Sequence, residues 1–258
     1  MKIAIVGYGG MGKMIEADAK ARGIEITSII DPVSKGATHK EISKESLKEA
    51  DIAIDFTHPS VILNNIKKYC DLKVNAVIGT TGWYDHIDEV KKQVESSGIK
   101  FLWASNYSIG VNIYFRIIET ASKLINYAED YDLWGNEIHH HNKVDSPSGT
   151  AKTLSDIMIK NIERKDKVVY EMLNRKIGKN EFHFSSTRGG PVNFEHTIGF
   201  DSAADCITIK HAARNRSGYA AGAVLASIWL DKQKHGYYEL DDFIKGLIPL
   251  KIDFKEER

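Results

Sequence analysis

The stretch KIAIVGYGGMGKMIEADAKARGIEITSIID, residues 2 to 31, decides the fold of the first part of the chain. It begins with a short β-branched run, turns through glycines into a segment with helical spacing, and ends in a second β-branched run. Gly7, Gly9 and Gly12 form the pattern G-x-G-x-x-G between the first strand and the helix. Such a turn is typical of a βαβ unit that holds a dinucleotide pyrophosphate at the free N–H groups of the helix start.

Asp31 closes the second predicted strand, 19 residues after Gly12. A carboxylate at this place would accept hydrogen bonds from an adenosine ribose. It suits a 2′-hydroxyl group and repels a 2′-phosphate, so the sequence predicts a preference for NADH over NADPH. Lys35, four residues further on, is the cation that would work against this preference, because a flexible lysine can bind the phosphate.

The same alternation continues beyond this stretch to about residue 105. Short β-branched runs are separated by longer segments with helical spacing, which indicates a parallel sheet with helices on both faces. The runs are KIAIV (2–6), IEITSII (24–30), DIAIDF (51–56), NAVIGT (75–80) and IKFLWAS (99–105).

Two polar segments follow later strands of this sheet, GTTG at 79–82 and ASNY at 104–107. Ligands of open α/β sheets bind outside the carboxyl ends of the strands, so both segments are candidates for cofactor contacts. A third segment, DFTHPS at 55–60, also ends a strand, but His58 before Pro59 is explained equally well by a structural turn.

After Asn106 the pattern changes. An amphipathic helix is predicted over 113–126, and the later strand candidates have the alternation of a one-sided sheet. These are DLWGNEIHH (132–140), EFHFSSTRG (181–189), FEHTIGF (194–200) and CITIKHAA (206–213). We therefore expect an α/β protein with two domains. Residues 1–106 form a Rossmann-type domain, on which 219–258 packs back, and residues 107–218 form an α+β domain with a mixed, largely antiparallel sheet.

Composition narrows the class of protein. The 258 residues include 35 Lys and Arg and 35 Asp and Glu, so the formal net charge is zero and offers no global attraction to nucleic acid or an anionic membrane. The longest apolar run, YAAGAVLASIWL, has 12 residues, whereas a membrane span needs roughly 20. The two cysteines, Cys70 and Cys206, lie far apart, which favours a reducing cytoplasm over a disulfide framework.

The segment EIHHHNKVDSPSGTA, residues 137–151, concentrates titratable side chains. A metal site is the less favoured interpretation, because consecutive histidines on a strand point to opposite faces and Lys143 would repel a cation. A polar loop in which Asp145 or Ser148 caps the next helix is a second interpretation. An acid/base site explains more, since histidine titrates near neutrality and a lysine beside it can donate a proton. The free N–H groups of Gly149 and Thr150 at the helix start would then hold a carboxylate of a small acidic substrate.

This segment resembles the signature E-x-H-H-x-x-K-x-D-x-P-S-G-T-A of the 4-hydroxy-tetrahydrodipicolinate reductase (dihydrodipicolinate reductase) family, and every fixed position is present. The likeness extends to the glycine loop, DFTHP, GTTG, SNYSIGVN, RGGPVNFEHTIGF and HAARNRSGYAAGAVLASIWL. It implies reduction of 4-hydroxy-tetrahydrodipicolinate to tetrahydrodipicolinate by NADH or NADPH, with loss of water, in the diaminopimelate route to lysine. It also implies a homotetramer built through the sheet of the second domain.

Position by position, the resemblance makes His139 the catalytic acid/base and Lys143 the proton donor. It assigns the substrate to His140, Gly149 and Thr150, with Ser148 beside them. The cofactor is assigned to the glycine loop, the end of the second strand and the two polar segments: Gly7, Tyr8, Gly9, Gly10, Met11, Gly12, Asp31, Gly79, Thr80, Thr81, Ala104, Ser105, Asn106 and Tyr107. No metal is implied.

Three positions depart from the family pattern. The glycine loop is one residue shorter and lacks the common arginine, His141 stands where arginine is usual, and Phe194 stands where the family has glycine. Two other functions stay open: an amino-acid or diamine dehydrogenase on the same two-domain plan, and an NAD(H)-binding sensor without catalysis. The set of proton donors argues against both.

Overall fold

The computed structural model describes residues 1–247 and divides the chain into two compact units. The first domain comprises residues 1–108 together with residues 217–247, and the second domain comprises residues 109–216. The sequence placed these boundaries after residues 106 and 218. Residues 248–258, the last part of the segment expected to return to the first domain, lie outside the described residues.

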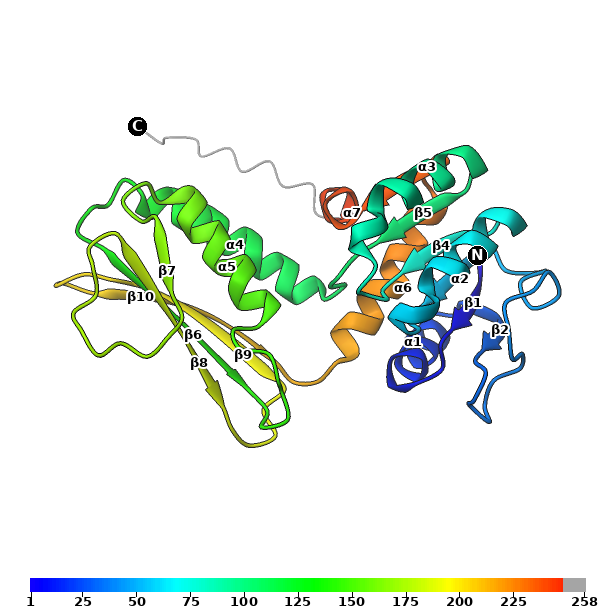
Figure 1. The fold of residues 1–258 in the computed structure, drawn as a ribbon, viewed down its shortest axis with the longest axis horizontal. Coiled ribbons are helices and arrows are strands. Elements are labelled where there is room, and N and C mark those ends of the chain that lie inside the picture. The colour runs from blue at the N-terminus through cyan, green and yellow to red at the C-terminus, as the bar shows by residue number, and fades with distance from the viewer. Residues whose placement is uncertain (248–258) are drawn as a thin grey trace. The chain divides into compact units, whose positions relative to one another are not determined.

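The first domain is built on a six-stranded sheet in which every neighbouring pair is parallel (Figure 1). The strand order is β11-β5-β4-β3-β1-β2. The strands are β1 Lys2–Val6, β2 Glu25–Ile30, β3 Ile52–Asp55, β4 Asn75–Ile78, β5 Lys100–Trp103 and β11 Gly236–Glu239. The predicted parallel sheet is confirmed. Strand β11 was not predicted, because four residues carry little pattern and its partner β5 is distant in sequence.

Helices cover both faces of this sheet because its strands are apolar at successive positions. Ala4, Val6 and Ala53 belong to a core shared with α2 and α3, while the intervening Ile3 and Ile5 are fully buried on the other face. On that face α6 contacts α1 and the strands β3, β4 and β5. The helices are α1 Gly10–Ala21, α2 Pro59–Leu72, the 3₁₀ turn η1 Tyr84–His86, α3 Ile87–Ser97, α6 Ser217–Asp231 and α7 Leu240–Leu247.

The second domain has a five-stranded sheet of order β10-β9-β6-β8-β7. Its elements are α4 Ile109–Ile125, β6 Asp132–His139, α5 Gly149–Asn161, β7 Lys167–Val169, β8 Glu181–Arg188, β9 Phe194–Asp201 and β10 Cys206–Ala213. Helices α4 and α5 pack together, and their apolar side chains form one core with β8 and β9. The predicted mixed sheet is confirmed, but only two of its four pairs are antiparallel. The antiparallel share is smaller than expected because α5 carries the chain from β6 to strands that run parallel to it.

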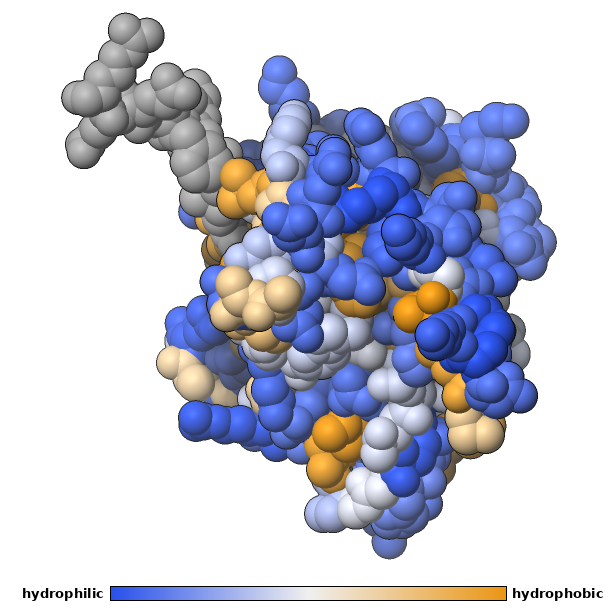
Figure 2. Space-filling model, turned by 90° about the vertical axis from the view of Figure 1, so that its left-hand side faces the viewer, coloured by the Kyte–Doolittle hydropathy of each residue, from blue (hydrophilic) through white to orange (hydrophobic). Residues whose placement is uncertain are grey.

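Several large apolar side chains are exposed, among them Leu124, Tyr127 and Val144. On the face that Figure 2 presents, hydrophobic residues form separate groups within a mainly hydrophilic surface. In the part of the chain that the structure describes, no helix combines the length and the apolarity that crossing a bilayer requires.

Candidate active site

The turn between β1 and α1 requires glycine at two points. A Cβ atom on Gly7, whose φ is 88°, would lie 2.2 Å from the carbonyl oxygen of Phe56, and one on Gly12 would lie 2.1 Å from the carbonyl oxygen of Gly7. Gly9 is the N-cap of α1 and provides no side-chain cap, and the first turn contains no acidic residue. The first N–H groups of α1 are thus left for an anion, and this cradle fits a pyrophosphate.

Asp31 lies directly behind this turn. One carboxylate oxygen accepts a hydrogen bond from the backbone N–H of Tyr8 at 2.7 Å, and the other accepts from the N–H groups of Val33 (2.9 Å) and Ser34 (2.7 Å). Partial burial acts to raise the pKa of Asp31, but these hydrogen bonds outweigh it and hold the pKa below its usual value. Asp31 therefore stays ionised and ties the glycine turn to the loop after β2.

Tyr8 extends this connection. Its ring lies against the same loop, since a Cβ atom on Gly36 would come within 2.8 Å of it, and its hydroxyl donates to Glu16. Gly10 and Met11 form the start of α1. The shorter glycine turn is thus packed against the loop that begins at Asp31.

The two polar segments at the strand ends, residues 79–82 and 104–107, offer mainly backbone groups to a ligand. The Thr80 hydroxyl is buried, accepts from the N–H of Thr57 at 2.7 Å and donates to Asp55 at 3.0 Å. The Tyr107 ring is buried, and its hydroxyl donates to the carbonyl oxygen of Ile78 at 2.9 Å. Ala104 is buried as well, whereas Thr81 and Ser105 are exposed and Gly79 and Asn106 are half-buried. A ligand at these strand ends would reach the main chain of Thr80, Ala104 and Tyr107, and not their side chains.

Asp55 was predicted only as the first residue of the strand-end segment 55–60, with no role of its own. It is fully buried at the end of β3 and accepts hydrogen bonds from Thr57, Asn65, Tyr69 and Thr80. Burial raises the pKa of Asp55, although these hydrogen bonds oppose the increase. Asp55 thus connects the segment at 55–60 to the segment at 79–82.

His58 is the N-cap of α2. Its Nδ1 atom accepts a hydrogen bond from the backbone N–H of Ser60 at 3.3 Å. The structural-turn interpretation of DFTHPS therefore describes this histidine.

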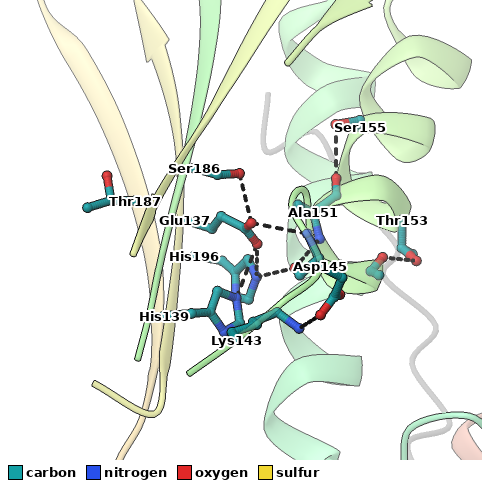
Figure 3. Close-up of polar contacts among 12 residues, drawn as sticks. Glu137, His139, Lys143, Asp145, Ala151, Thr153, Ser155, Ser186, Thr187 and His196 are labelled. Carbon is teal, nitrogen blue, oxygen red and sulfur yellow. Dashed lines mark hydrogen bonds and ion pairs between the residues drawn. The ribbon is translucent and has the colours of Figure 1, made fainter. Parts of the chain in front are cut away.

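The second cluster forms at the end of β6 around Glu137 (Figure 3). Glu137 is fully buried, and the strand register places His196 of β9 and Ser186 of β8 directly opposite it. Its oxygen Oε2 lies 3.1 Å from Nε2 of His139 and 3.3 Å from Nε2 of His196. In Figure 3 both imidazole rings lie beside this carboxylate, between the sheet and α5.

The other carboxylate oxygen, Oε1, accepts three hydrogen bonds. They come from the N–H of Ser148 at 3.0 Å, the hydroxyl of Ser186 at 2.8 Å and Nη2 of Arg188 at 2.9 Å. Burial acts to raise the pKa of Glu137, but hydrogen bonds from His139, His196, Ser148 and Arg188 prevail and hold it far below its usual value. Glu137 is therefore a buried anion at neutral pH.

His139 is buried, with its side chain 8% exposed. Its ring stacks on that of Phe194 on β9, with centroids 6.0 Å apart and planes at 25°, and meets His196 edge-on at 5.2 Å. Strand β6 ends at His139, so the alternation expected to carry through His140 and His141 stops there. His141 is instead held through its Nδ1 atom to the carbonyl oxygen of Gly190 at 3.0 Å.

Two basic side chains follow His139. His140 is half-buried, and burial together with the nearby charges of Arg216, His139, His141 and Lys143 lowers its pKa. The ammonium group of Lys143 lies 2.7 Å from a carboxylate oxygen of Asp145. The hydrogen bond from Lys143, opposed by partial burial, lowers the pKa of Asp145. Lys143 therefore already has an anionic partner, which a substrate carboxylate would have to replace.

Helix α5 begins directly after this loop. Ser148 is its N-cap, and the Ser148 hydroxyl accepts from the N–H of Ala151 at 3.1 Å, as the capping interpretation predicted. The same hydroxyl lies 3.2 Å from Nε2 of His196. Among the described residues, no hydrogen bond involves the N–H groups of Gly149 and Thr150, the first two residues of the helix. Ser148 thus caps the N–H of Ala151, and the N–H groups of Gly149 and Thr150 are available to an anion.

Glu137, His139 and His196 each offer an atom within 4.8 Å of the others, which is the donor set of a possible metal site. The run of consecutive histidines did not reveal this group, because His196 is distant from it in sequence. The Glu137 carboxylate forms an ion pair with Arg188 and has four further polar contacts, to His139, His196, Ser148 and Ser186. Among the described residues, Arg188 therefore provides the positive charge that balances Glu137.

Several residues of this cluster were absent from the predicted site. Glu137 could have been found, because two residues before His139 on a strand means the same face. His196, Arg188 and Phe194 reach the cluster only through the pairing of β6 with β9 and β8. A single sequence does not show that pairing.

Comparison with known proteins identifies the family. The family model described as dihydrodipicolinate reductase, N-terminus, matches residues 1–107, and the one described as dihydrodipicolinate reductase, C-terminus, matches residues 110–244. The chain is 34% identical to a 4-hydroxy-tetrahydrodipicolinate reductase of Christiangramia forsetii, with 96% of this chain and 99% of the relative covered. A protein of the same name from Staphylococcus haemolyticus is 33% identical, with 94% and 100% covered.

Solved structures share the fold. A dipicolinate-bound dihydrodipicolinate reductase from Paenisporosarcina sp. TG-14 gives a TM-score of 0.74 at 20% identity, covering 94% of this chain and 98% of that one. An amine dehydrogenase from Mycobacterium smegmatis gives 0.60 at 11% identity, covering 92% and 94%. These likenesses concern architecture, whereas the two family models together span nearly the whole described chain. The chain belongs to the dihydrodipicolinate reductase family.

Proposed function

We propose that this protein reduces 4-hydroxy-tetrahydrodipicolinate to tetrahydrodipicolinate with NADH or NADPH, and so acts in lysine biosynthesis through diaminopimelate. In this reaction one hydride and one proton enter and one water leaves. The family membership and the names of the full-length relatives support the proposal. The observation that carries it is the buried Glu137, which contacts both His139 and the backbone N–H of Ser148. This carboxylate places a histidine that can exchange protons beside the start of α5, where a substrate carboxylate can bind.

A nicotinamide cofactor supplies the hydride when bound. The cradle of Gly7 to Gly12 at the start of α1 would hold its pyrophosphate, and Asp31 its adenosine ribose. Gly79 to Thr81 and Ala104 to Tyr107 would offer main-chain groups at the strand ends.

The substrate has two carboxylates, as does the dipicolinate named for the solved relative. We assign one carboxylate to the free N–H groups of Gly149 and Thr150, where the helix start favours negative charge. His140 and Lys143 would hold the anion from the loop, with Ser148 fixing the helix start. Binding then exchanges the Lys143–Asp145 ion pair for one between Lys143 and the substrate.

Loss of water requires a proton at the departing hydroxyl group. We assign this proton to the Lys143 ammonium, and we assign to His139 the role of acid/base that restores the proton balance. The burial of His139 behind Phe194 and His196 excludes water from one side of its ring.

The proposal is tested by NADH oxidation after adding pyruvate and aspartate semialdehyde together with the upstream synthase, which makes the substrate in situ. We expect rapid oxidation by the wild type and a loss of kcat of roughly 10²- to 10⁴-fold in His139→Ala and in Lys143→Ala. Cofactor dissociation constants should hardly change in these variants. Oxidation of diamines or amino acids with release of ammonia, in place of imine reduction, would favour the amine-dehydrogenase alternative.

We also propose a homotetramer formed through the second-domain sheet. Along β6, Trp134, Asn136 and Ile138 alternate with buried neighbours and stay half-buried, and Ile207 on β10 is 46% exposed. Light scattering should give four times the chain mass of 28.9 kDa.

Both cysteines are free, Cys70 buried and Cys206 exposed, which supports a reducing compartment such as the cytoplasm.

A further inference from the structure

We propose that Glu137 is the positioning residue of this site: it holds His139 in the tautomer that carries its proton on Nε2, so that Nδ1 is the free base, and it simultaneously fixes the start of α5. This inference deepens the proposed function and rests on it. No role for Glu137 follows from its residue type alone, because a buried carboxylate on a strand can be purely structural.

The two oxygens of Glu137 have different partners. Oε2 faces the two imidazole nitrogens, Nε2 of His139 at 3.1 Å and Nε2 of His196 at 3.3 Å. Oε1 faces the backbone N–H of Ser148, the hydroxyl of Ser186 and the guanidinium of Arg188. One side of the carboxylate therefore orients the histidines, and the other side holds the helix start and the Arg188 side chain.

An ionised carboxylate only accepts hydrogen bonds, so the proton in the contact to His139 lies on Nε2. A neutral imidazole carries a single ring proton, and Nδ1 is then left with its lone pair. In the described part of the chain Nδ1 of His139 has no hydrogen-bonding partner. The stacked Phe194 ring restricts rotation of the imidazole away from this arrangement.

Burial makes the arrangement effective. Glu137 is fully buried, and Arg188, whose side chain is 19% exposed, supplies the compensating charge. Water does not compete for the carboxylate, so each charged hydrogen bond is stronger than at a surface. Burial lowers the pKa of the neighbouring His196, an effect that Glu137 opposes, and its Nε2 lies 3.2 Å from the Ser148 hydroxyl as well as 3.3 Å from Glu137.

Glu137→Gln separates the two functions. The amide oxygen of the introduced side chain, placed at the Oε1 position, keeps the contacts to Ser148, Ser186 and Arg188. The amide NH₂ group then faces the Nε2–H of His139, and this clash between two donors is relieved when the His139 imidazole carries its proton on Nδ1 instead. The substitution should therefore change the His139 tautomer while the helix start and the substrate carboxylate site are preserved.

The experiment measures kcat, KM and the ring ¹⁵N shifts of histidine-labelled protein, with His139 assigned by comparison with His139→Gln. We expect Nε2–H in the wild type, Nδ1–H in Glu137→Gln, and a loss of kcat of roughly 10²-fold with little change in KM. In the His139→Ala background, Glu137→Gln should have little further effect on kcat, because it acts through the missing ring.

Glu181→Gln is the matched control. Glu181 is also a buried carboxylate of this domain, held by Arg175, Lys167 and the N–H of Gly178, and it lies at the opposite end of strand β8 from Arg188. The substitution should lower stability and leave kcat and the His139 tautomer unchanged.

Wild-type kcat in Glu137→Gln, a loss that multiplies with His139→Ala, or an Nδ1–H tautomer in the wild type would each overturn the proposal. If the variant fails to fold, the wild-type tautomer alone decides. Failure of the proposed function looks different: the wild type would then not reduce the substrate, or His139→Ala would turn over normally.

Discussion

At the scale of single residues, Asp31 shows how a predicted contact acquires a second role. The sequence indicated a carboxylate for the ribose, and the structure shows the same carboxylate accepting three backbone N–H groups, including that of Tyr8 in the glycine turn. Each carboxylate oxygen has more than one lone pair, so a ribose hydroxyl can still bind. Asp31 therefore both orders the turn and sets the charge that a cofactor meets.

We predict that the wild type has a higher kcat/KM with NADH than with NADPH, because Asp31 stays ionised and repels a 2′-phosphate. Asp31→Ser should reduce this ratio and also weaken binding of both cofactors, since Tyr8 loses its anchor. Lys35→Ala is the companion variant, because it removes the cation that can bind the 2′-phosphate of NADPH. The measurement is kcat/KM for both cofactors, and an NADPH preference in the wild type would contradict the assignment of Asp31 to the ribose.

Thr80 gives a second prediction at this scale. Thr80→Val removes two hydrogen bonds, the one from the N–H of Thr57 to the Thr80 hydroxyl and the one from that hydroxyl to Asp55. Both groups keep a partner, because the N–H of Thr57 also donates to Asp55 at 3.1 Å and Asp55 also accepts from the Thr57 hydroxyl at 2.7 Å. One hydrogen bond contributes about 0.5–1.5 kcal/mol, so loss of the two should lower the free energy of unfolding by about 1–3 kcal/mol. Thr80→Ser keeps the hydroxyl and should lose much less. Urea unfolding measures both, and equal losses would show that the methyl group, not the hydroxyl, matters.

At the scale of elements, the start of α5 combines a satisfied cap with two free N–H groups. Gly149 is the first helical residue, and a Cβ atom there would meet nothing within 4 Å. Proline is well tolerated at this position, and Ser148 before it is extended, as proline requires. The site therefore permits removal of one N–H group without loss of the helix.

Gly149→Pro should weaken competitive inhibition by pyridine-2,6-dicarboxylate, because it deletes a donor to the carboxylate. One charge-assisted hydrogen bond is worth about 1.5–3 kcal/mol, which is roughly 10- to 100-fold in Ki. Gly149→Ala keeps the N–H group and is the control. The comparison is the ratio of the two Ki values; a ratio near one, with both variants folded, would favour a helix start that only caps.

Most elements were predictable because their patterns are local. Strands β1, β3 and β4 consist mainly of adjacent buried apolar residues, and the cap at Ser148 involves only the nearby Ala151. Strand β7 has three residues and β11 has four, too few for a pattern. The parallel pairing of β6 with β8 depends on where α5 returns the chain, and the contacts of His196 and Arg188 with Glu137 depend on the pairing of β6 with its two neighbours. The sequence therefore predicted the helix start and the histidines, but not the carboxylate network that orients them.

At the scale of the whole molecule, each domain contains a fully buried carboxylate, and the two differ in their partners. Asp55 of the first domain accepts hydrogen bonds from uncharged groups, and burial raises its pKa. Glu137 of the second domain has Arg188 as well as two imidazoles, and its pKa is held far below its usual value. The two domains should therefore respond to acid with opposite signs.

A carboxylate whose folded pKa is depressed contributes stability above its unfolded pKa, about 4.3 for Glu, and this contribution is lost as the pH falls further. A carboxylate whose folded pKa is raised favours the folded state as the pH falls toward its unfolded pKa, about 3.9 for Asp. Acidification from neutral pH to about 4 should thus spare or stabilise the first domain through Asp55. Below about 4 it should weaken the second domain through Glu137.

Amide hydrogen exchange, expressed as protection factors for peptides of each domain, measures this difference. As the pH is lowered, we expect protection in β6, β8 and β9 to fall before protection in β1, β3 and β4. In Glu137→Gln the second-domain protection should start lower at neutral pH and depend less on pH, because Glu137 no longer titrates; the pH dependence that remains comes from other carboxylates with a lowered pKa, such as Glu181. Asp55→Asn should remove any gain in the first domain. Loss of protection in the first domain before the second would contradict this account. It would mean that the folded state depends on the ionised form of Asp55, which has no charged partner, and not on that of Glu137, which is paired with Arg188.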